Sequence, residues 1–206
     1  SNFTFLTGAS HPEEMVTRAA ELGLEAIAIT DRNSLAGVVR AYSALKVLRE
    51  EAEETVKIRS QNVTDASSRQ EVGHHTPIAV PSTMSLPKLI VGCRLVLRDS
   101  DVNWVALPQD RPAYARLSRL LTLGKRRAEK GECFLDFSDL QKCCHGMILI
   151  ALPAGDTRKC AREIQALQGT YPGCVFLGAA PRYDGSDQAY FDHCAYLARK
   201  TAAPMV

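Results

Sequence analysis

Two hydrophobic periods alternate along the chain, and each predicts a different kind of element. Apolar residues recur at helical spacing after Ser10, which with Glu13 forms a capping-box pattern, and this period ends at Gly23. Short, continuously apolar runs are instead typical of buried parallel strands. The predicted helices cover residues 10–22, 35–54, 112–124, 156–168 and 186–201. The predicted strands cover residues 25–30, 88–97, 104–107, 147–152, 174–177 and 203–206.

This order of strands and helices predicts an α/β fold with a parallel sheet covered by helices. The periods do not choose between an open, doubly wound sheet and a closed barrel. Residues 55–87 are rich in Ser, Thr, Gln, His and Pro and lack any period, so we expect an insertion or long surface loop there. We expect one domain over residues 1–206. We also expect the chain to be cut near both ends, because it lacks an initiator Met and its last predicted strand stops at Val206.

Composition narrows the class of protein. The chain has 206 residues, 46% hydrophobic and 23% charged, with a formal net charge of +2, which is ordinary for a globular domain. Its longest apolar run, 147–152, is far shorter than the roughly 20 residues of a membrane helix. The first residues also lack the pattern of a signal peptide. The seven cysteines lie mostly in apolar runs, as reduced thiols do in the cytoplasm. We therefore expect a cytoplasmic protein without membrane contact.

Asp31 and Arg94 are the charged residues that are the strongest single candidates for a functional site. Asp31 follows a predicted strand, where a β/α enzyme places catalytic groups, but a carboxylate there can equally cap the next helix and pair with Arg32. Helix caps are the commoner case. Arg94 stands inside an apolar strand, and a buried guanidinium needs a carboxylate or an anion. Asp31 is one candidate partner.

The cysteines and histidines give weaker indications of a site. No Cys–His motif surrounds Cys93, so a buried structural thiol is the better interpretation than a nucleophile. Cys133, Cys143, Cys144 and His145 are metal-ligand types at poor spacing for zinc. The pair at 74–75 is interpreted as part of a solvated loop.

Residues 111–130 concentrate positive charge in a nearly neutral chain. They hold seven cations and one acid, Glu129. The cations are Arg111, Arg116, Arg119, Lys125, Arg126, Arg127 and Lys130. They could contact nucleic-acid phosphates, or form a solvated helix face that docks an acidic partner. There is no P-loop, GxGxxG or GxSxG motif.

Four separated segments, in order, resemble a known family. They are residues 1–14, 29–40, 90–95 and 116–133. Together they are similar to the polymerase-and-histidinol-phosphatase (PHP) domain of bacterial C-family DNA polymerase III alpha subunits, and most of all to the error-prone, damage-inducible branch. The resemblance covers nearly the whole chain outside 55–87. It implies a distorted, TIM-like β/α barrel.

Active PHP proteins hold a metal cluster that hydrolyses phosphoesters, and the resemblance places its ligands on this chain one at a time. The opening His-x-His and the terminal Asp-x-His fall outside residues 1–206. The other family ligands correspond to Thr7, Arg32, Arg94 and a position near Asn103. An arginine cannot bind a metal, because it has no acceptor. We therefore hypothesise a degenerate pocket in which Arg32 and Arg94 form ion pairs beside Asp31.

The resemblance implies a metal-free scaffold or interaction module, without catalytic residues or a cofactor of its own. The parent polymerase would synthesise DNA across lesions using Mg²⁺ outside this sequence. Implied partners are the remaining polymerase domains, DNA through the parent, and accessory polymerase subunits. The alternative is a divergent phosphoesterase, either a proofreading 3′–5′ exonuclease or a pyrophosphatase, with Zn²⁺ or Mn²⁺ in an intact site.

Overall fold

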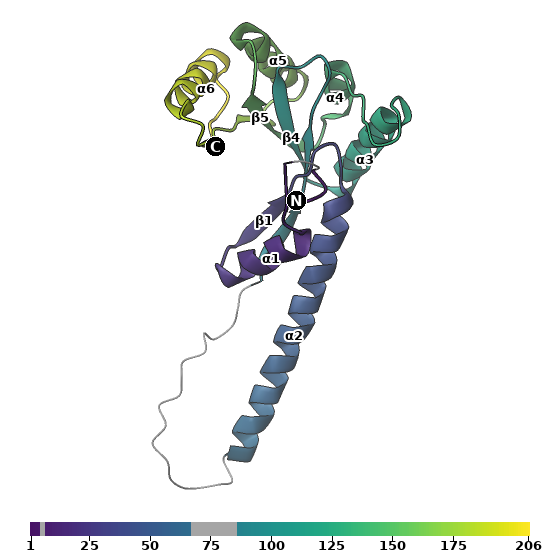
Figure 1. Ribbon diagram of the computed structural model, residues 1–206, viewed down its shortest axis with the longest axis vertical. Coiled ribbons are helices and arrows are strands. Elements are labelled where there is room, and N and C mark those ends of the chain that lie inside the picture. Colours follow the sequence, from purple (N-terminus) through teal and green to yellow (C-terminus); the bar gives the residue numbers. More distant parts are fainter. Residues whose placement is uncertain (5–6, 67–85) are drawn as a thin grey trace.

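The chain folds into a mixed α/β structure built around two small sheets (Figure 1). The structure is a computed structural model that describes residues 1–4, 7–66 and 86–206. Its helices are α1 (Pro12–Glu21), α2 (Ala36–Ala66), α3 (Arg111–Arg126), α4 (Phe137–Cys143), α5 (Thr157–Thr170) and α6 (Asp187–Thr201). Its strands are β1 (Ala26–Ile29), β2 (Lys88–Val91), β3 (Cys93–Leu95), β4 (Val102–Pro108), β5 (Met147–Pro153) and β6 (Val175–Leu177). In the described part of the chain, no helix is long and apolar enough to cross a membrane.

The prediction of an all-parallel sheet was wrong. β1 and β2 pair in parallel, and so do β5 and β6, but β4 runs antiparallel to both of its neighbours, β3 and β5. Between β4 and β5 the chain makes two helical traverses, α3 and the short α4, where the periodicity predicts one. Two traverses return the chain to the end of the sheet that it left, where the Gln109 N–H donates to the Gly146 carbonyl at 3.0 Å. The next strand must then run back antiparallel.

The predicted strand 88–97 is divided at Gly92 between the two sheets. β2 pairs with β1, whereas β3 pairs with β4. A Cβ at position 92 would lie 2.6 Å from a Leu107 side-chain carbon and 2.8 Å from one of Thr30, so a larger residue would force these side chains to shift. The Gly92 N–H donates to the Ile29 carbonyl at 3.1 Å, which keeps the end of β1 beside the crossing point.

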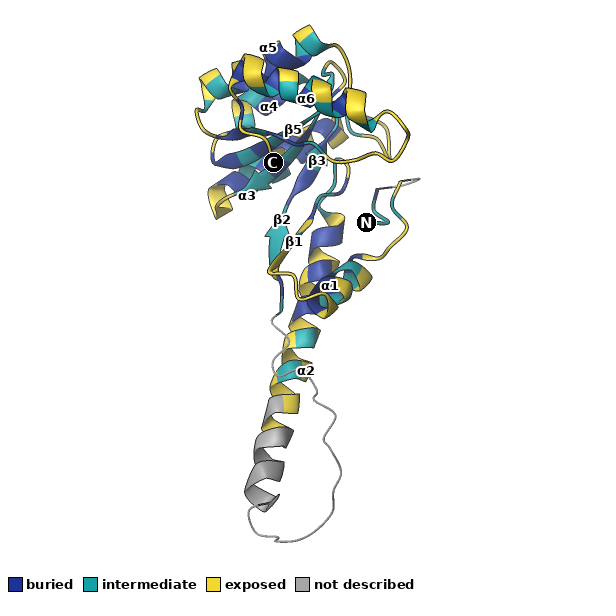
Figure 2. Ribbon diagram, turned by 90° about the vertical axis from the view of Figure 1, so that its left-hand side faces the viewer, coloured by how far each residue is buried: buried dark blue, intermediate teal, exposed yellow. Residues whose placement is uncertain are grey.

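The larger core lies between the four-stranded sheet and helices α3, α5 and α6. It includes the fully buried side chains of Trp104, Leu117, Leu149 and Ile164. A smaller cluster, with Val16, Ile29 and Leu45 among its members, joins α1 and the first turns of α2 to the two-stranded sheet. Figure 2 shows the buried residues gathered mainly around the four-stranded sheet.

The ends of two predicted helices differ from expectation. α1 is capped one residue later than predicted, at His11, whose backbone N–H donates to the Glu14 carboxylate at 2.8 Å. Gly23 does take the expected left-handed conformation, at φ +66°. α2 continues to Ala66, so residues 55–66 are helical and not a surface loop, which was one of the two alternatives expected for 55–87. Residues 67–85 of that loop lie outside the described residues.

Candidate functional site

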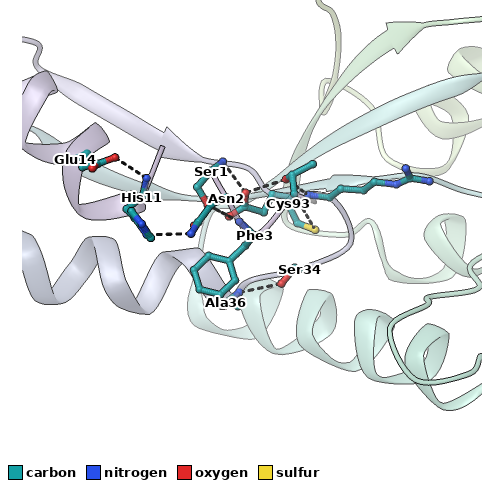
Figure 3. Close-up of polar contacts among 11 residues, drawn as sticks. Ser1, Asn2, Phe3, His11, Glu14, Ser34, Ala36 and Cys93 are labelled. Carbon is teal, nitrogen blue, oxygen red and sulfur yellow. Dashed lines mark hydrogen bonds and ion pairs between the residues drawn. The ribbon is translucent and has the colours of Figure 1, made fainter. Parts of the chain in front are cut away.

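Asp31 is a buried carboxylate at the carboxyl end of β1, and it is 1% exposed. The Ser1 hydroxyl lies within 2.9 Å of Oδ1 and 2.8 Å of Oδ2, and the Thr4 hydroxyl donates to Oδ1 at 2.9 Å. The Ser1 backbone nitrogen lies 2.7 Å from Oδ1. Figure 3 shows Ser1 and its neighbours converging between β1 and α2. Both carboxylate oxygens therefore have close donors from the first residues of the chain.

Gly37, in the first turn of α2, makes room for this arrangement. A Cβ at position 37 would collide with Oδ2 of Asp31 and would lie 3.0 Å from the Ser1 hydroxyl oxygen. The helix thus approaches Asp31 closely without a side chain in between. Asp31 does not cap α2; instead the Ser34 hydroxyl accepts from the Ala36 N–H at 3.2 Å.

The predicted ion pairs of Arg32 and Arg94 with Asp31 were wrong. Among the described residues, neither arginine forms an ion pair with Asp31, whose carboxylate instead accepts from the Ser1 and Thr4 hydroxyls. The two arginines meet through their backbones, in an isolated parallel bridge. The Arg94 N–H donates to the Asp31 carbonyl at 3.0 Å, and the Asn33 N–H donates to the Arg94 carbonyl at 2.9 Å. The cause is local: the carboxylate is already satisfied by Ser1 and Thr4.

The other two residues of the predicted pocket are dispersed. Thr7 is exposed, and its N–H donates to the Thr4 carbonyl at 3.2 Å. Asn103 is half-buried on β4. Arg94 pairs with Val105 across the sheet, so by strand alternation Arg94 and Asn103 share the face that points away from the larger core. The Arg94 Nε on this face is buried and has no hydrogen-bond partner among the described residues.

These five positions do not fit the metal cluster that the family resemblance implies. Thr7 and Asn103 offer only neutral oxygens, and Arg32 and Arg94 are cations without an acceptor. Asp31, the one carboxylate, has both oxygens engaged. In the described part of the chain, no group of three or more His, Cys, Asp or Glu side chains comes together.

The cysteines behave as small core residues. Burial raises the pKa of Cys93 to about 12, and its thiol donates to the Asp31 carbonyl at 3.4 Å. Burial likewise raises the pKa of the Cys133, Cys143 and Cys144 thiols. Thiols held in the protonated form are poor nucleophiles, which agrees with the structural interpretation of Cys93. The histidines at 74–75 lie outside the described residues.

The basic segment divides into cations used by the fold and cations left exposed. Arg116 donates to the His145 carbonyl through Nε at 2.9 Å and Nη2 at 2.6 Å. Arg127 forms an ion pair with Asp139 through two nitrogens, at 2.5 and 3.3 Å. The remaining members are exposed on α3 and the turn that follows it; they are Arg111, Arg119, Lys125, Arg126 and Lys130.

A cleft of about 590 Å³ lies between the β1–α2 connection and the segment that links α3 to α4. It joins two sets of residues that sequence reasoning kept apart. Arg32, from the predicted pocket, lines the same cleft as Lys125 and Lys130, from the basic segment. The other lining residues are Phe3, Thr4, Asn33, Ser34, Glu129, Gly131, Glu132, Cys133 and Phe134. No sequence signal links Arg32 to Lys125, because they are 93 positions apart and share the cleft only through the tertiary structure.

Comparisons with known proteins agree with the resemblance found in the sequence. The family model described as PHP domain matches residues 1–172. An error-prone DNA polymerase of Ruegeria pomeroyi is 68% identical over the whole chain, which covers 19% of that protein. Error-prone DNA polymerases of Rhodopseudomonas palustris and Brucella abortus are 38% and 35% identical over 91% and 100% of the chain, which covers 14% and 16% of them. The chain thus spans less than a fifth of the length of these relatives.

A solved structure shows the same fold at low sequence identity. It is a protein of Bifidobacterium adolescentis described as a candidate metal-dependent phosphoesterase, with a TM-score of 0.55 and 13% identity. The match covers 96% of this chain and 81% of that one. Because the family model matches residues 1–172 and relatives are up to 68% identical over the full chain, this chain belongs to the PHP domain family.

Proposed function

We propose that this chain is a structural PHP module of an error-prone DNA polymerase, without a metal cluster or a hydrolytic activity of its own. The observation that carries the proposal is the state of Asp31. It is the single acid of the predicted pocket, its oxygens are satisfied by Ser1 and Thr4, and the neighbouring family positions are Arg32 and Arg94. A pocket of this composition can stabilise a fold but offers a metal few ligands.

The names of the relatives support the polymerase context. Proteins 68% and 38% identical to the chain are error-prone DNA polymerases several times its length. In this proposal the parent protein synthesises DNA across lesions in the cytoplasm, with Mg²⁺ held by other domains. The module supports those domains, contacts DNA through the parent, and offers a surface to accessory polymerase subunits.

The finer fold in this proposal is a distorted β/α barrel. The face of the four-stranded sheet that carries Arg94 and Asn103 also carries half-buried apolar residues such as Ile148 and Ile150. An inward barrel face has this composition. Met205 forms a parallel bridge with Leu177 and so begins to extend the sheet beyond β6.

A chimeric polymerase tests the proposal that this chain is part of an error-prone DNA polymerase. This chain replaces the matching segment of the Ruegeria pomeroyi polymerase, and primer extension over an abasic site is measured. We expect synthesis comparable to that of the unmodified enzyme. A folded chimera without synthesis contradicts the proposal.

Hydrolysis assays on the same chimera test the scaffold role. The substrates are bis-p-nitrophenyl phosphate, a 3′-labelled DNA strand and pyrophosphate, each with Mn²⁺, Zn²⁺ or Mg²⁺. We expect no hydrolysis that depends on Asp31, so the Asp31→Asn chimera should match its parent. Metal-dependent hydrolysis that disappears in Asp31→Asn would instead establish the divergent phosphoesterase.

A further inference from the structure

The exposed cations of α3 occupy one side of the helix. With 100° of rotation per residue, Arg111, Arg119, Lys125 and Arg126 fall within an arc of about 120°. Arg116, outside this arc, is turned toward the body of the protein and holds the His145 carbonyl. The four arc residues are exposed, and no ion pair engages any of them in the part of the chain that the structure describes. The helix thus presents free positive charge along about 22 Å of its length, at 1.5 Å per residue.

The cleft continues this charge at the carboxyl end of α3. Lys125 belongs to both the helix face and the cleft, and Lys130 and Arg32 line the cleft beside it. Lys125 also acts electrostatically inside it: burial raises the pKa of Cys133, and the charge of Lys125 opposes that rise. We call Arg32, Arg111, Arg119, Lys125, Arg126 and Lys130 the basic surface.

The basic surface has few internal acids to neutralise it. Glu129 and Glu132 line the cleft, but neither forms an ion pair with its cations among the described residues. Six cations therefore face two acids in a protein whose formal net charge is only +2. Such a local excess attracts a polyanion at a rate and affinity that depend on salt.

We infer that the basic surface binds the phosphodiester backbone of DNA. This inference rests on the proposed function, because a polymerase module lies close to nucleic acid. A row of exposed cations suits the repeating charge of a backbone and makes no use of base identity. An interface with an acidic protein would need a buried apolar centre, whereas the large apolar residues exposed on α3 are Tyr114 and Leu123, at 43% and 39%. Tyr114 can add a stacking contact to a base.

Salt-dependent binding tests this inference. Fluorescence anisotropy of a labelled dT20 strand and of a 20-base-pair duplex is measured against KCl concentration, with the 206-residue chain and with the chimeric polymerase. In the Arg119→Gln/Arg126→Gln variant, the slope of log K against log salt should become shallower by about 1.4 for the single strand and about 1.8 for the duplex. Comparing the single strand with the duplex shows which form of DNA the basic surface binds.

The matched control is Arg158→Gln/Arg162→Gln, which removes the same charge from exposed positions on α5. This control should keep the parent's slope, and thermal unfolding should show that both variants are folded. Equal slopes for the two variants would overturn the inference, as would the absence of salt-dependent binding by the parent. Stronger binding of poly-glutamate than of DNA at equal charge would overturn it in favour of an acidic protein partner.

Primer extension separates this inference from the proposed function. If the chimera synthesises DNA but its affinity for DNA is unchanged in the Arg119→Gln/Arg126→Gln variant, only the inference that the basic surface binds DNA is contradicted. A chain that binds DNA through these residues but cannot support synthesis in the chimera contradicts the proposed function alone.

Discussion

The two sheets of this protein are stabilised in different ways. The four-stranded sheet is packed on one face by α3, α5 and α6, and its core includes the fully buried Trp104 and Leu149. The two-stranded sheet rests on α1 and the first turns of α2, and its buried cluster is small. In that smaller region the Ser1 and Thr4 hydroxyls gather around the buried Asp31 carboxylate.

This difference indicates how the candidate pocket is built. Apolar burial stabilises the larger region with about 25 cal/mol per Å², without directional requirements. The smaller region depends more on hydrogen bonds at Asp31, whose loss leaves buried donors unsatisfied. The hydrogen bonds of Asp31 thus join the first residues of the chain to the end of β1.

The largest expected effect is a cavity in the larger core. Leu149→Ala, at a fully buried position on β5, should lower the free energy of unfolding by about 3–5 kcal/mol. Leu45→Ala, at 7% exposure in the smaller cluster, should have the smaller effect, about 2 kcal/mol. Urea denaturation of the chain measures both. Equal effects would remove the contrast between the two cores.

The next effect concerns Asp31. Asp31→Ala should destabilise the chain by about 1–3 kcal/mol, because the Ser1 and Thr4 hydroxyls lose their buried acceptor. Thr4→Val should also destabilise it, whereas Thr4→Ser, which keeps a hydroxyl, should stay close to the parent. A stable Asp31→Ala variant would show that this contact does not support the smaller region.

Gly37→Ala tests the close approach of α2 to Asp31, because the direction of its effect on stability should be the reverse of the usual one. Alanine normally favours a helix over glycine by about 1 kcal/mol. At position 37 the new methyl group would collide with Asp31, so we expect destabilisation instead. The matched control is Gly169→Ala near the end of α5, where a Cβ meets no atom within 4 Å among the described residues. There the usual gain should appear, and a gain at both positions would contradict the close approach of α2.

Two carboxylates of the larger region should respond to pH in opposite directions. Burial alone would raise the pKa of Asp139, but hydrogen bonds from Arg127 and the Asp136 N–H, with the charge of Arg127, lower it overall. Its contribution to stability is therefore present above about pH 4 and lost as pH falls further. Burial raises the pKa of Glu163, against the opposing hydrogen bond from Ser100. Its carboxyl thus opposes folding increasingly as pH rises above about 4.3.

Denaturation at pH 3 and pH 7 measures these two contributions. Asp139→Asn should lose more stability at pH 7 than at pH 3. Glu163→Gln should gain stability relative to the parent between pH 3 and pH 7. The same pH response in both variants would show that their surroundings do not differ as described.

The sequence predicted most elements of the larger region and few of the contacts of the smaller one. β4, β5, β6, α3, α5 and α6 follow strong local periods and are confirmed within a few residues. The short helix α4 has too few residues to show a period, and missing it hid the antiparallel course of β5.

The contacts of the candidate site depend on tertiary structure. The donors to Asp31 come from 27 and 30 residues earlier in the chain, where no local pattern marks them. The ion pairs expected for Arg32 and Arg94 failed for the same reason, because the carboxylate had acquired other partners. The charge of the basic segment was visible in the sequence, but its division into internal and exposed cations depends on His145 and Asp139.

Metal titration shows whether Asp31 belongs to a metal site. Isothermal titration calorimetry with Mn²⁺ and with Zn²⁺ compares the chain, alone and in the chimeric polymerase, with the Asp31→Asn variant. We expect parent and variant to give the same heats, with no saturable site that depends on Asp31. Stoichiometric binding by the parent that Asp31→Asn abolishes would contradict the metal-free scaffold and establish a metal site at Asp31.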